Sequence, residues 1–169
     1  MNQKTNETEK LRMFHVSRAE SGIAHFRLLT HFGTLAAAKQ RAKSVAMAGA
    51  RLTLYEVDIH VGNALQVADL VDDVRGNNHS WVRLADTLRY DEKVISAHER
   101  DSVFVAGGAG GQNGEAGGAR LAEVLRSKGF DSIVYENRFE DAGSKSVITL
   151  RENQVEIIAV APLNDQQLS

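Results

Sequence analysis

The stretch KGFDSIVYENRFEDAGSKSVITLRENQV, residues 128–155, says most about the fold of this chain. Gly129 follows a helical pattern and is expected to end that helix, because glycine readily takes the left-handed conformation found just past a helix. Two apolar runs follow, at 130–136 and 146–150, and each is typical of a strand. The polar corner between them should join the two strands. The stretch therefore predicts a helix end, a strand, a corner and a second strand.

The rest of the chain adds strands and short helices around this unit. Strict alternation over 51–61 predicts a strand, as do the shorter runs 13–16 and 155–161, while 63–70 looks irregular but extended. Helices are expected at 35–48, capped by Thr34 and ended by Gly49, and at 119–128. A further helix begins at Ser80 and places Trp81, Leu84, Ala85 and Leu88 on one apolar face. We expect a single α+β domain with more strands than long helices.

A glycine-rich segment, 107–118, separates an apparent strand at 103–105 from the helix at 119–128. This outline is that of a nucleotide-binding unit, but the fingerprint Gly-x-Gly-x-x-Gly fails because Asn113 occupies its third glycine position. A phosphate-binding loop also fails, because Gly118 is followed by Ala119 and Arg120. The segment is interpreted as a flexible surface loop, with a mobile loop beside an active site as the alternative.

Composition excludes several classes of protein. The chain has 169 residues, a formal net charge of −2 and no cysteine, so disulfides, thiolate metal sites and coating of nucleic acid by bulk charge are not expected. Its six histidines lack the spacing of a zinc-protease helix, and no metal site is predicted. No apolar run is long enough for a membrane span. We expect a cytoplasmic protein, open to delivery into another cell, with tails at 1–12 and 163–169 around one domain at 13–162.

Three separated segments carry a resemblance to a known family. In order and spacing, 14–17, 30–34 and 130–154 resemble ADP-ribosyltransferases of the diphtheria-toxin and poly(ADP-ribose) polymerase type, and look closest to small phage- and toxin-associated members. The matching positions are His15, His31-Phe32-Gly33-Thr34, Asn63-Ala64-Leu65, Gly129-Phe130-Asp131-Ser132-Ile133-Val134-Tyr135, Asn137, Glu140, Ser146-Val147-Ile148-Thr149 and Gln154-Val155. The resemblance implies a split antiparallel β-sheet core with flanking short helices.

The resemblance also implies a substrate and a set of residues that bind it. NAD would bind bent, His15 would hydrogen-bond the adenosine ribose, and the backbone after His15 would hold the nicotinamide amide. His31 would stack on nicotinamide through its imidazole ring. The positions implied to contact NAD are His15, Val16, Ser17, His31, Phe32, Thr34, Tyr135, Asn137 and Ser146.

The catalytic carboxylate departs from the family pattern. Polymerase-type relatives carry a glutamate at the position of Ser146, and a second tyrosine near Ala42, and this chain has neither. A carboxylate stabilises the oxocarbenium-like charge that develops when the glycosidic bond breaks. Glu140 is the expected replacement, acting with His15, if the polar corner folds back over the cleft. Asp141 and Glu152 are weaker alternatives.

These residues predict an enzyme that moves ADP-ribose from NAD to a macromolecular acceptor, either a protein or a nucleic acid. A bacterial toxin or effector, or a phage factor directed against its host, fits the size and the resemblance. One alternative is a degraded transferase fold that serves as a binding or inhibitory module, which the missing tyrosine and glutamate favour. Another is an NAD glycohydrolase, with water as the acceptor.

Overall fold

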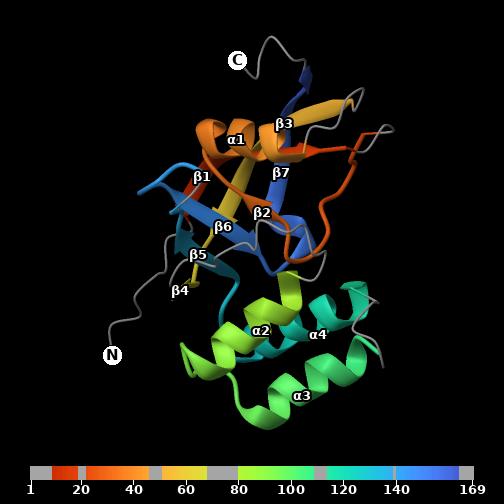
Figure 1. Cartoon of the computed structure of the whole chain (residues 1–169), viewed down its shortest axis with the longest axis vertical. Helices are drawn as coiled ribbons and strands as arrows, with labels where there is room; N and C mark the ends of the chain where they lie inside the picture. The colour runs from red at the N-terminus through yellow and green to blue at the C-terminus, as the bar shows by residue number, and fades with distance from the viewer. Residues whose placement is uncertain are drawn as a thin grey trace.

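The computed structural model describes residues 9–18, 22–45, 51–67, 80–108, 114–138 and 140–163. Over these ranges the chain is an α+β protein with two β-sheets and four α-helices. Figure 1 shows the helices α2, α3 and α4 gathered at one end of the molecule and the two sheets at the other. None of the described helices is long and apolar enough to cross a membrane.

The first sheet, sheet A, contains three antiparallel strands in the order β1-β3-β7. These strands span Glu9–Ser17, Leu52–Val61 and Val155–Leu163. The central strand β3 has the alternation recognised at 51–61, and its predicted bounds are confirmed to within one residue. A bulge opposite Glu56 and Val57 shifts the register between β3 and β7.

The second sheet, sheet B, contains four strands in the order β2-β6-β5-β4. They span His31–Phe32, Lys145–Thr149, Ser132–Glu136 and Ala64–Val67. The pairs β2–β6 and β5–β6 are antiparallel, so the predicted strand–corner–strand unit is confirmed, whereas β4 pairs with β5 in parallel. A short 3₁₀ turn, Glu152–Gln154, leads from sheet B into β7.

Sheet B is buried on both faces, which explains the continuous apolar runs of β5 and β6. Alternate residues of a strand point to opposite faces. Val134 and Val147 therefore pack against sheet A, while Ile133 and Ile148 pack against the helices. The result is three layers, sheet A, sheet B and the helices α2 to α4 (Figure 1).

The helix α1, Leu35–Val45, covers the opposite face of sheet A. Its Ala42 packs with Leu52 and Leu163 in a small cluster of its own. Thr34 caps it as predicted, accepting a hydrogen bond from the Ala37 amide at 3.1 Å. The predicted end of this helix at Gly49 lies outside the described residues.

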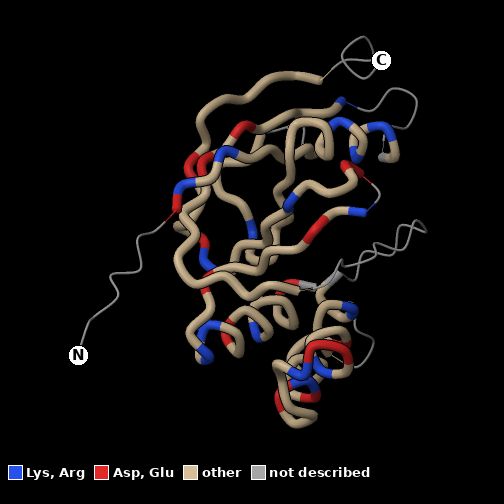
Figure 2. The backbone as a smooth tube through the Cα atoms, turned by 90° about the vertical axis from the view of Figure 1, so that its left-hand side faces the viewer, with Lys and Arg blue, Asp and Glu red and all other residues tan. Residues whose placement is uncertain are grey.

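The first strand begins earlier than its sequence indicates, because charged partners on other strands hold it. Residues 9–12, expected in a flexible tail, belong to β1. Lys10 and Arg12 both pair with the buried carboxylate of Asp58 on β3, at 2.7 Å and 2.5 Å. Figure 2 shows acidic and basic segments side by side where the chain enters this strand. Residues 1–8 and 164–169 of the expected tails lie outside the described residues, and Leu163 belongs to β7.

The helical layer corrects the prediction for residues 103–118. The layer consists of α2 (Ser80–Tyr90), α3 (Ala97–Ala106) and α4 (Gly114–Ser127). The segment 103–105 is the end of α3 rather than a strand. Ser96 and Glu99 begin α3 with a capping box, in which each side chain accepts a hydrogen bond from the other residue's backbone amide.

Two glycines of the supposed loop provide space for the single tryptophan. A Cβ atom added at Gly107 would lie 2.5 Å from the Trp81 ring, and one added at Gly117 would lie 2.6 Å from it. Trp81 is 3% exposed and packs in the core of the helical layer, as the spacing of its helix predicted. Residues 114–118 are thus helical and closely packed, while 109–113 lie outside the described residues.

Candidate functional site

Most of the predicted site residues meet at the β2–α1 junction, residues 31–34. Phe14 of β1 and Gly33 exchange two backbone hydrogen bonds, of 2.8 and 3.0 Å, which join sheet A to the end of β2. Beyond this bridge β1 continues to Ser17 along β3, whereas the chain after Gly33 turns into α1. The helix α1 packs against the end of β1, where Val16 contacts the cluster around Ala42, and His15 lies between this contact and the bridge.

His15 has a fixed orientation and a defined protonation state. Its Nδ1 lies 2.9 Å from the carbonyl oxygen of His31, an acceptor, so Nδ1 carries the hydrogen. Its ring packs against Phe26 and Phe32, with centroids 5.3 and 5.6 Å away. Burial lowers the pKa of His15, and nearby Arg41 lowers it further, against the raising effect of the His31 carbonyl. The neutral imidazole consequently keeps a lone pair on Nε2, which can accept a hydrogen bond.

His31 and Tyr135 form a second hydrogen-bonded pair. Their Nδ1 and hydroxyl oxygen lie 3.0 Å apart, and Tyr135 is buried in the core that faces the helices. Phe32, the next residue of β2, is 1% exposed and packs towards sheet A. Because neighbouring residues of a strand point to opposite faces, the rings of His15 and His31 lie on opposite sides of β2. The structure connects the two histidines through the backbone but does not place their rings in one cavity.

Val16 presents backbone groups rather than a side chain. In an antiparallel strand, backbone groups two residues apart point to the same edge. Phe14 directs its N–H and C=O towards Gly33, so Val16 directs its own towards the same edge, beyond the bridge. This edge offers one donor and one acceptor beside His15. Ser17 is the last residue of β1.

Ser146, which the resemblance matches to a catalytic glutamate, is buried, with 2% of its surface exposed. The hydroxyl is buried and accepts a hydrogen bond of 2.7 Å from Asn137, whose amide nitrogen also bonds Ser144. A Cβ atom added at Gly33 would lie 3.2 Å from this hydroxyl. Asn137 and Ser146 therefore place the start of β6 against the β2–α1 junction, and a Cβ atom at Gly33 would also lie 3.0 Å from the Ala37 Cβ, so position 33 has little space for a side chain.

The polar corner folds back onto α1. Asp141 accepts a hydrogen bond from the Thr34 hydroxyl, the same group that caps the helix. Glu140 lies 4.0 Å from a guanidinium nitrogen of Arg41, and its side chain is 30% exposed. Two carboxylates from the corner thus lie along the first turns of α1. The proximity of Arg41 was not foreseen, because nothing in its sequence context distinguishes it from the other basic residues of the helix.

Several residues on which the resemblance rests form hydrogen bonds or turns that stabilise the fold. The Asp131 carboxylate accepts hydrogen bonds from the amides of Gly62 and Asn63, at 3.0 and 2.9 Å, and joins the start of β4 to the start of β5. The Gln154 side chain bonds the amides of Leu150 and Arg151 and the carbonyl of His60. Gly129 has a φ of 92°, which confirms its predicted place after a helix. At these positions the resemblance therefore reflects residues that stabilise the fold, not residues that take part in a reaction.

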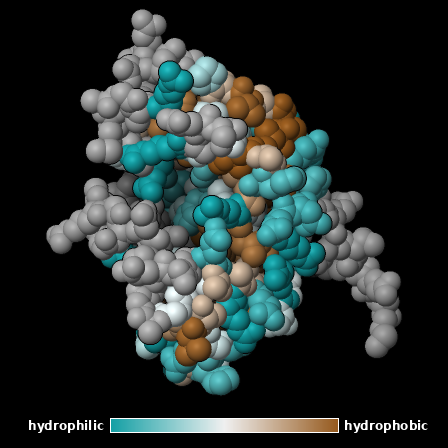
Figure 3. All heavy atoms as spheres, turned by 90° about the vertical axis from the view of Figure 1, so that its right-hand side faces the viewer, coloured by the Kyte–Doolittle hydropathy of each residue, from teal (hydrophilic) through white to brown (hydrophobic). Residues whose placement is uncertain are grey.

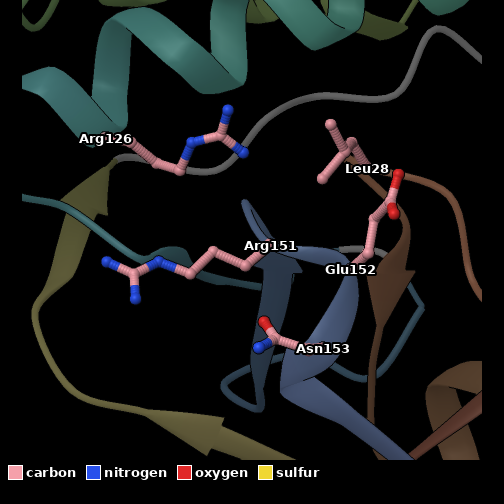
Figure 4. A pocket seen from close by; sticks show the side chains of 5 residues that line it. All are labelled: Leu28, Arg126, Arg151, Glu152 and Asn153. Carbon is pink, nitrogen blue, oxygen red and sulfur yellow. The ribbon is translucent and has the colours of Figure 1, made fainter.

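A surface hollow of about 530 Å³ lies at the other end of β6. It is lined by Leu28, Arg126, Arg151, Glu152 and Asn153 (Figure 4). Arg126 is anchored there by a hydrogen bond of 2.8 Å to the carbonyl of Leu150. At about 3.3 Å per strand residue, this end of β6 is more than 10 Å from Ser146. Glu152, named as an alternative catalytic acid, therefore belongs to a different region from His15. No group of three or more metal-ligating side chains occurs among the described residues.

Comparisons with known proteins identify no family for this chain. No protein-family model matches the chain, and no curated protein matches it. A solved structure, the MbcT–MbcA toxin–antitoxin complex of M. tuberculosis, aligns with 95% of this chain and 88% of its own chain, at 12% identity and a TM-score of 0.46. A likeness of this size does not establish a common fold. Function must therefore be inferred from the residues of this chain.

Proposed function

We propose that this chain is an enzyme that uses NAD and transfers ADP-ribose to a macromolecule. The observation that carries the proposal is the neutral, oriented imidazole of His15 beside the bridge between Phe14 and Gly33. A fixed lone pair beside a strand edge that pairs with no other described strand beyond the bridge suits a ligand that has both hydroxyl groups and a carboxamide. NAD has both, on its riboses and on its nicotinamide.

Each group near His15 has a complementary group in NAD. The Nε2 atom would accept a hydrogen bond from a ribose hydroxyl. The N–H and C=O of Val16 would pair with the carboxamide, which itself offers one acceptor and donors in a plane. Ser17 would lie beside the same edge. Phe32 and Thr34 would support the site rather than touch NAD, because Phe32 is buried and the Thr34 hydroxyl already serves the helix cap.

Glu140 would supply the negative charge that the reaction needs. Cleavage of the bond between nicotinamide and ribose builds positive charge on the ribose, and a carboxylate close by stabilises it. The bond electrons leave with nicotinamide, which becomes neutral, and an acceptor nucleophile then attacks the same carbon and loses its proton. Arg41, 4.0 Å from Glu140, would hold the carboxylate in place and would also attract the diphosphate of NAD.

The test is transfer of label from NAD to material in a bacterial lysate, with proteins and nucleic acids resolved separately. His15→Ala and Glu140→Gln should abolish or strongly reduce the labelled product. His98→Ala and Glu123→Gln are matched controls, since both side chains are exposed on the helical layer. Equal labelling by all four variants and the unaltered chain would refute the assignment of the site. The class of the labelled molecule would identify the acceptor as protein or nucleic acid.

A binding module is the second candidate, and the burial of Ser146 at the family's glutamate position favours it. Such a module would bind NAD without consuming it. A ligand at about 100 times its Kd stabilises the folded state by about 2.7 kcal/mol, which raises the melting temperature. Stabilisation by NAD, with NAD recovered intact, would identify the module. Loss of NAD without any labelled acceptor would instead identify a glycohydrolase.

A further inference from the structure

One stretch of the chain has an unusual balance of charge. Residues 21–55 contain no Asp or Glu but five basic residues, Arg27, Lys39, Arg41, Lys43 and Arg51. Of the 20 Lys and Arg in the chain the other 15 lie elsewhere, together with all 22 Asp and Glu. A chain whose formal net charge is −2 thus concentrates positive charge in one stretch. A local concentration of this kind indicates a polyanionic partner, even where the whole protein is slightly acidic.

Most of this charge lies on α1. Lys39, Arg41 and Lys43 belong to this helix, which contains no acidic residue, whereas α2, α3 and α4 each carry both signs of charge. Lys39 and Lys43 are one helical turn apart, and like charges at this spacing destabilise a helix slightly. In the part of the chain that the structure describes, neither lysine forms a side-chain hydrogen bond or ion pair. Their charge is therefore available to a partner.

The two lysines lie on the side of α1 that is turned away from sheet A. Ala38 and Ala42 are 6% and 0% exposed and mark the side against the sheet, while Lys39 is half-buried and Lys43 is exposed. Apart from Leu35 in the first turn, the exposed positions beside the lysines are small or polar: Ala36, Gln40 and Ser44. This surface lacks the large apolar residues with which a helix binds a membrane, so its charge decides what it binds.

The end of sheet A adds two more basic residues to this surface. Ser17 and Thr53 pair at the end of β1 and the start of β3, so Arg18, which follows β1, and Arg51, which precedes β3, leave the sheet at the same end. Both arginines are exposed, and Ala42 of α1 packs against the start of β3 at this end. We call the surface formed by Arg18, Lys39, Lys43 and Arg51 the basic surface.

The charged and the apolar surfaces of this part of the molecule are separate. Figure 2 shows Lys and Arg along α1 in its upper right part. Figure 3 views the molecule from the opposite side and shows an apolar patch in its upper part, the part that contains sheet A. The large apolar residues exposed on the described strands of sheet A are Ile158 and Val160, both on β7 rather than beside α1. A partner on the basic surface is thus attracted by charge.

The basic surface adjoins the candidate site. Arg41 stands between Lys39 and Lys43 in the sequence, but it lies on the flank of α1 that meets the polar corner, 4.0 Å from Glu140. One turn of an α-helix rises about 5.4 Å, so both lysines are within about one turn of the residue that contacts Glu140. A molecule bound along the lysines therefore passes beside the carboxylate.

We propose that the basic surface binds the phosphodiester backbone of a nucleic acid strand, and that this strand is the acceptor of ADP-ribose. The second half of the statement rests on the proposed function. Separate cations spread over α1 and the end of sheet A suit a linear row of phosphates, and contacts of this kind position a strand without reading its sequence. An amino or hydroxyl group of the strand would form the new bond to the ribose and release its proton to solvent, while nicotinamide leaves with the electrons of the broken bond.

The first test measures binding without NAD, by fluorescence anisotropy of a labelled single strand, with RNA and DNA of the same sequence in separate arms. Each cation that contacts a phosphate of a single strand contributes about 0.7 to the slope of log affinity against log salt. Lys39→Gln and Lys43→Gln should each lower that slope by about 0.7 and weaken binding about eightfold in about 50 mM salt. The arm that binds more tightly identifies the strand as RNA or DNA.

Two matched controls remove one positive charge elsewhere. Lys93→Gln and Arg151→Gln change exposed residues that lie outside α1 and the adjoining end of sheet A, and should leave the slope unchanged. Equal effects of the controls and the α1 variants, or no binding by the unaltered chain, would overturn the basic surface as a site. The α1 variants should keep the stabilisation that NAD gives to the unaltered chain, which shows that they remain folded.

The second test joins binding to transfer, with labelled NAD and the same strand. Label on the strand, reduced in Lys39→Gln and Lys43→Gln in step with their binding, would support the whole proposal. Label on proteins alone would overturn the strand as acceptor and leave the proposed function standing. Binding that depends on the lysines, with no label on any molecule, would support the basic surface and refute the transferase.

Discussion

Adding one methyl group to α4 should have opposite effects at two adjacent glycines. Gly117 and Gly118 both lie inside the helix and are both buried. A Cβ atom at Gly117 would lie 2.6, 2.7 and 2.9 Å from three ring atoms of Trp81. A Cβ atom at Gly118 would meet only the end of the Leu29 side chain, at 3.3 Å. Replacing either glycine by alanine therefore changes the same backbone but meets different neighbours.

The two contributions have known sizes. Alanine stabilises a helix interior by about 0.5–1 kcal/mol relative to glycine. Carbon atoms pack at about 3.5–4.0 Å, so the methyl group at position 117 would overlap the indole by about 1 Å, and overpacking of a core costs about 1–3 kcal/mol. Trp81 is 3% exposed and enclosed by three helices, so its ring cannot simply move aside. Gly118→Ala should then be neutral or stabilising, and Gly117→Ala less stable than it by about 1–3 kcal/mol.

Urea unfolding of both variants, followed by circular dichroism, measures this difference. The slope of free energy against urea should be the same for the two, which shows that the same surface unfolds. The double variant Gly117→Ala with Trp81→Phe should recover part of the loss, because the smaller ring leaves room for the methyl group. If Gly117→Ala is as stable as Gly118→Ala, the close packing of the Trp81 ring against Gly117 is refuted.

Three further changes test local interactions. Ser96→Ala removes the cap of α3 and should cost about 1 kcal/mol of unfolding free energy, measured in urea. Asp131→Ala leaves two backbone amides without their carboxylate and should cost about 1–3 kcal/mol, while a purified folded variant keeps any NAD activity, since this residue joins strands. Because burial lowers the pKa of His15 in the folded state, its contribution is fully present above the unfolded pKa of about 6.5 and is lost as the pH falls below it. His15→Gln should flatten this part of the stability profile, and an unchanged profile would contradict the burial effect.

Local patterns in the sequence predicted the elements that depend on neighbours along the chain. The alternation of β3, the glycine after α4 and the two strands around the polar corner all follow from such patterns. The start of β1 did not, because Lys10 and Arg12 are ordered by Asp58, nearly fifty positions later in the chain. The strand expected at 103–105 was wrong because its β-branched residues outweighed the capping signal at Ser96 and Glu99, which the sequence does contain.

The geometry of the candidate site also depends on contacts between residues far apart in the chain, which local sequence patterns do not predict. His15 contacts the β2–α1 junction, and the polar corner folds back onto α1, while the catalytic role of Glu140 stays a prediction. The opposite directions of the His15 and His31 rings depend on the register of β2 with β6, which no pattern of a two-residue strand reveals. The burial of Ser146 likewise follows from its contacts with Asn137 and Gly33, and these appear only when the corner is folded.

The parallel pairing of β4 with β5 has a consequence for the order of folding. Asn63 and Asp131, which join the starts of these strands, are 68 residues apart in the chain, and all three helices of the helical layer lie between them. The corner between β5 and β6 closes over a few residues, whereas β4 can dock only after a long loop has closed, at a larger entropic cost. We expect β5 and β6 to pair early and β4 to join last. Amide hydrogen exchange during refolding should then protect Ile133, whose backbone faces β6, before Val67, whose backbone faces β5.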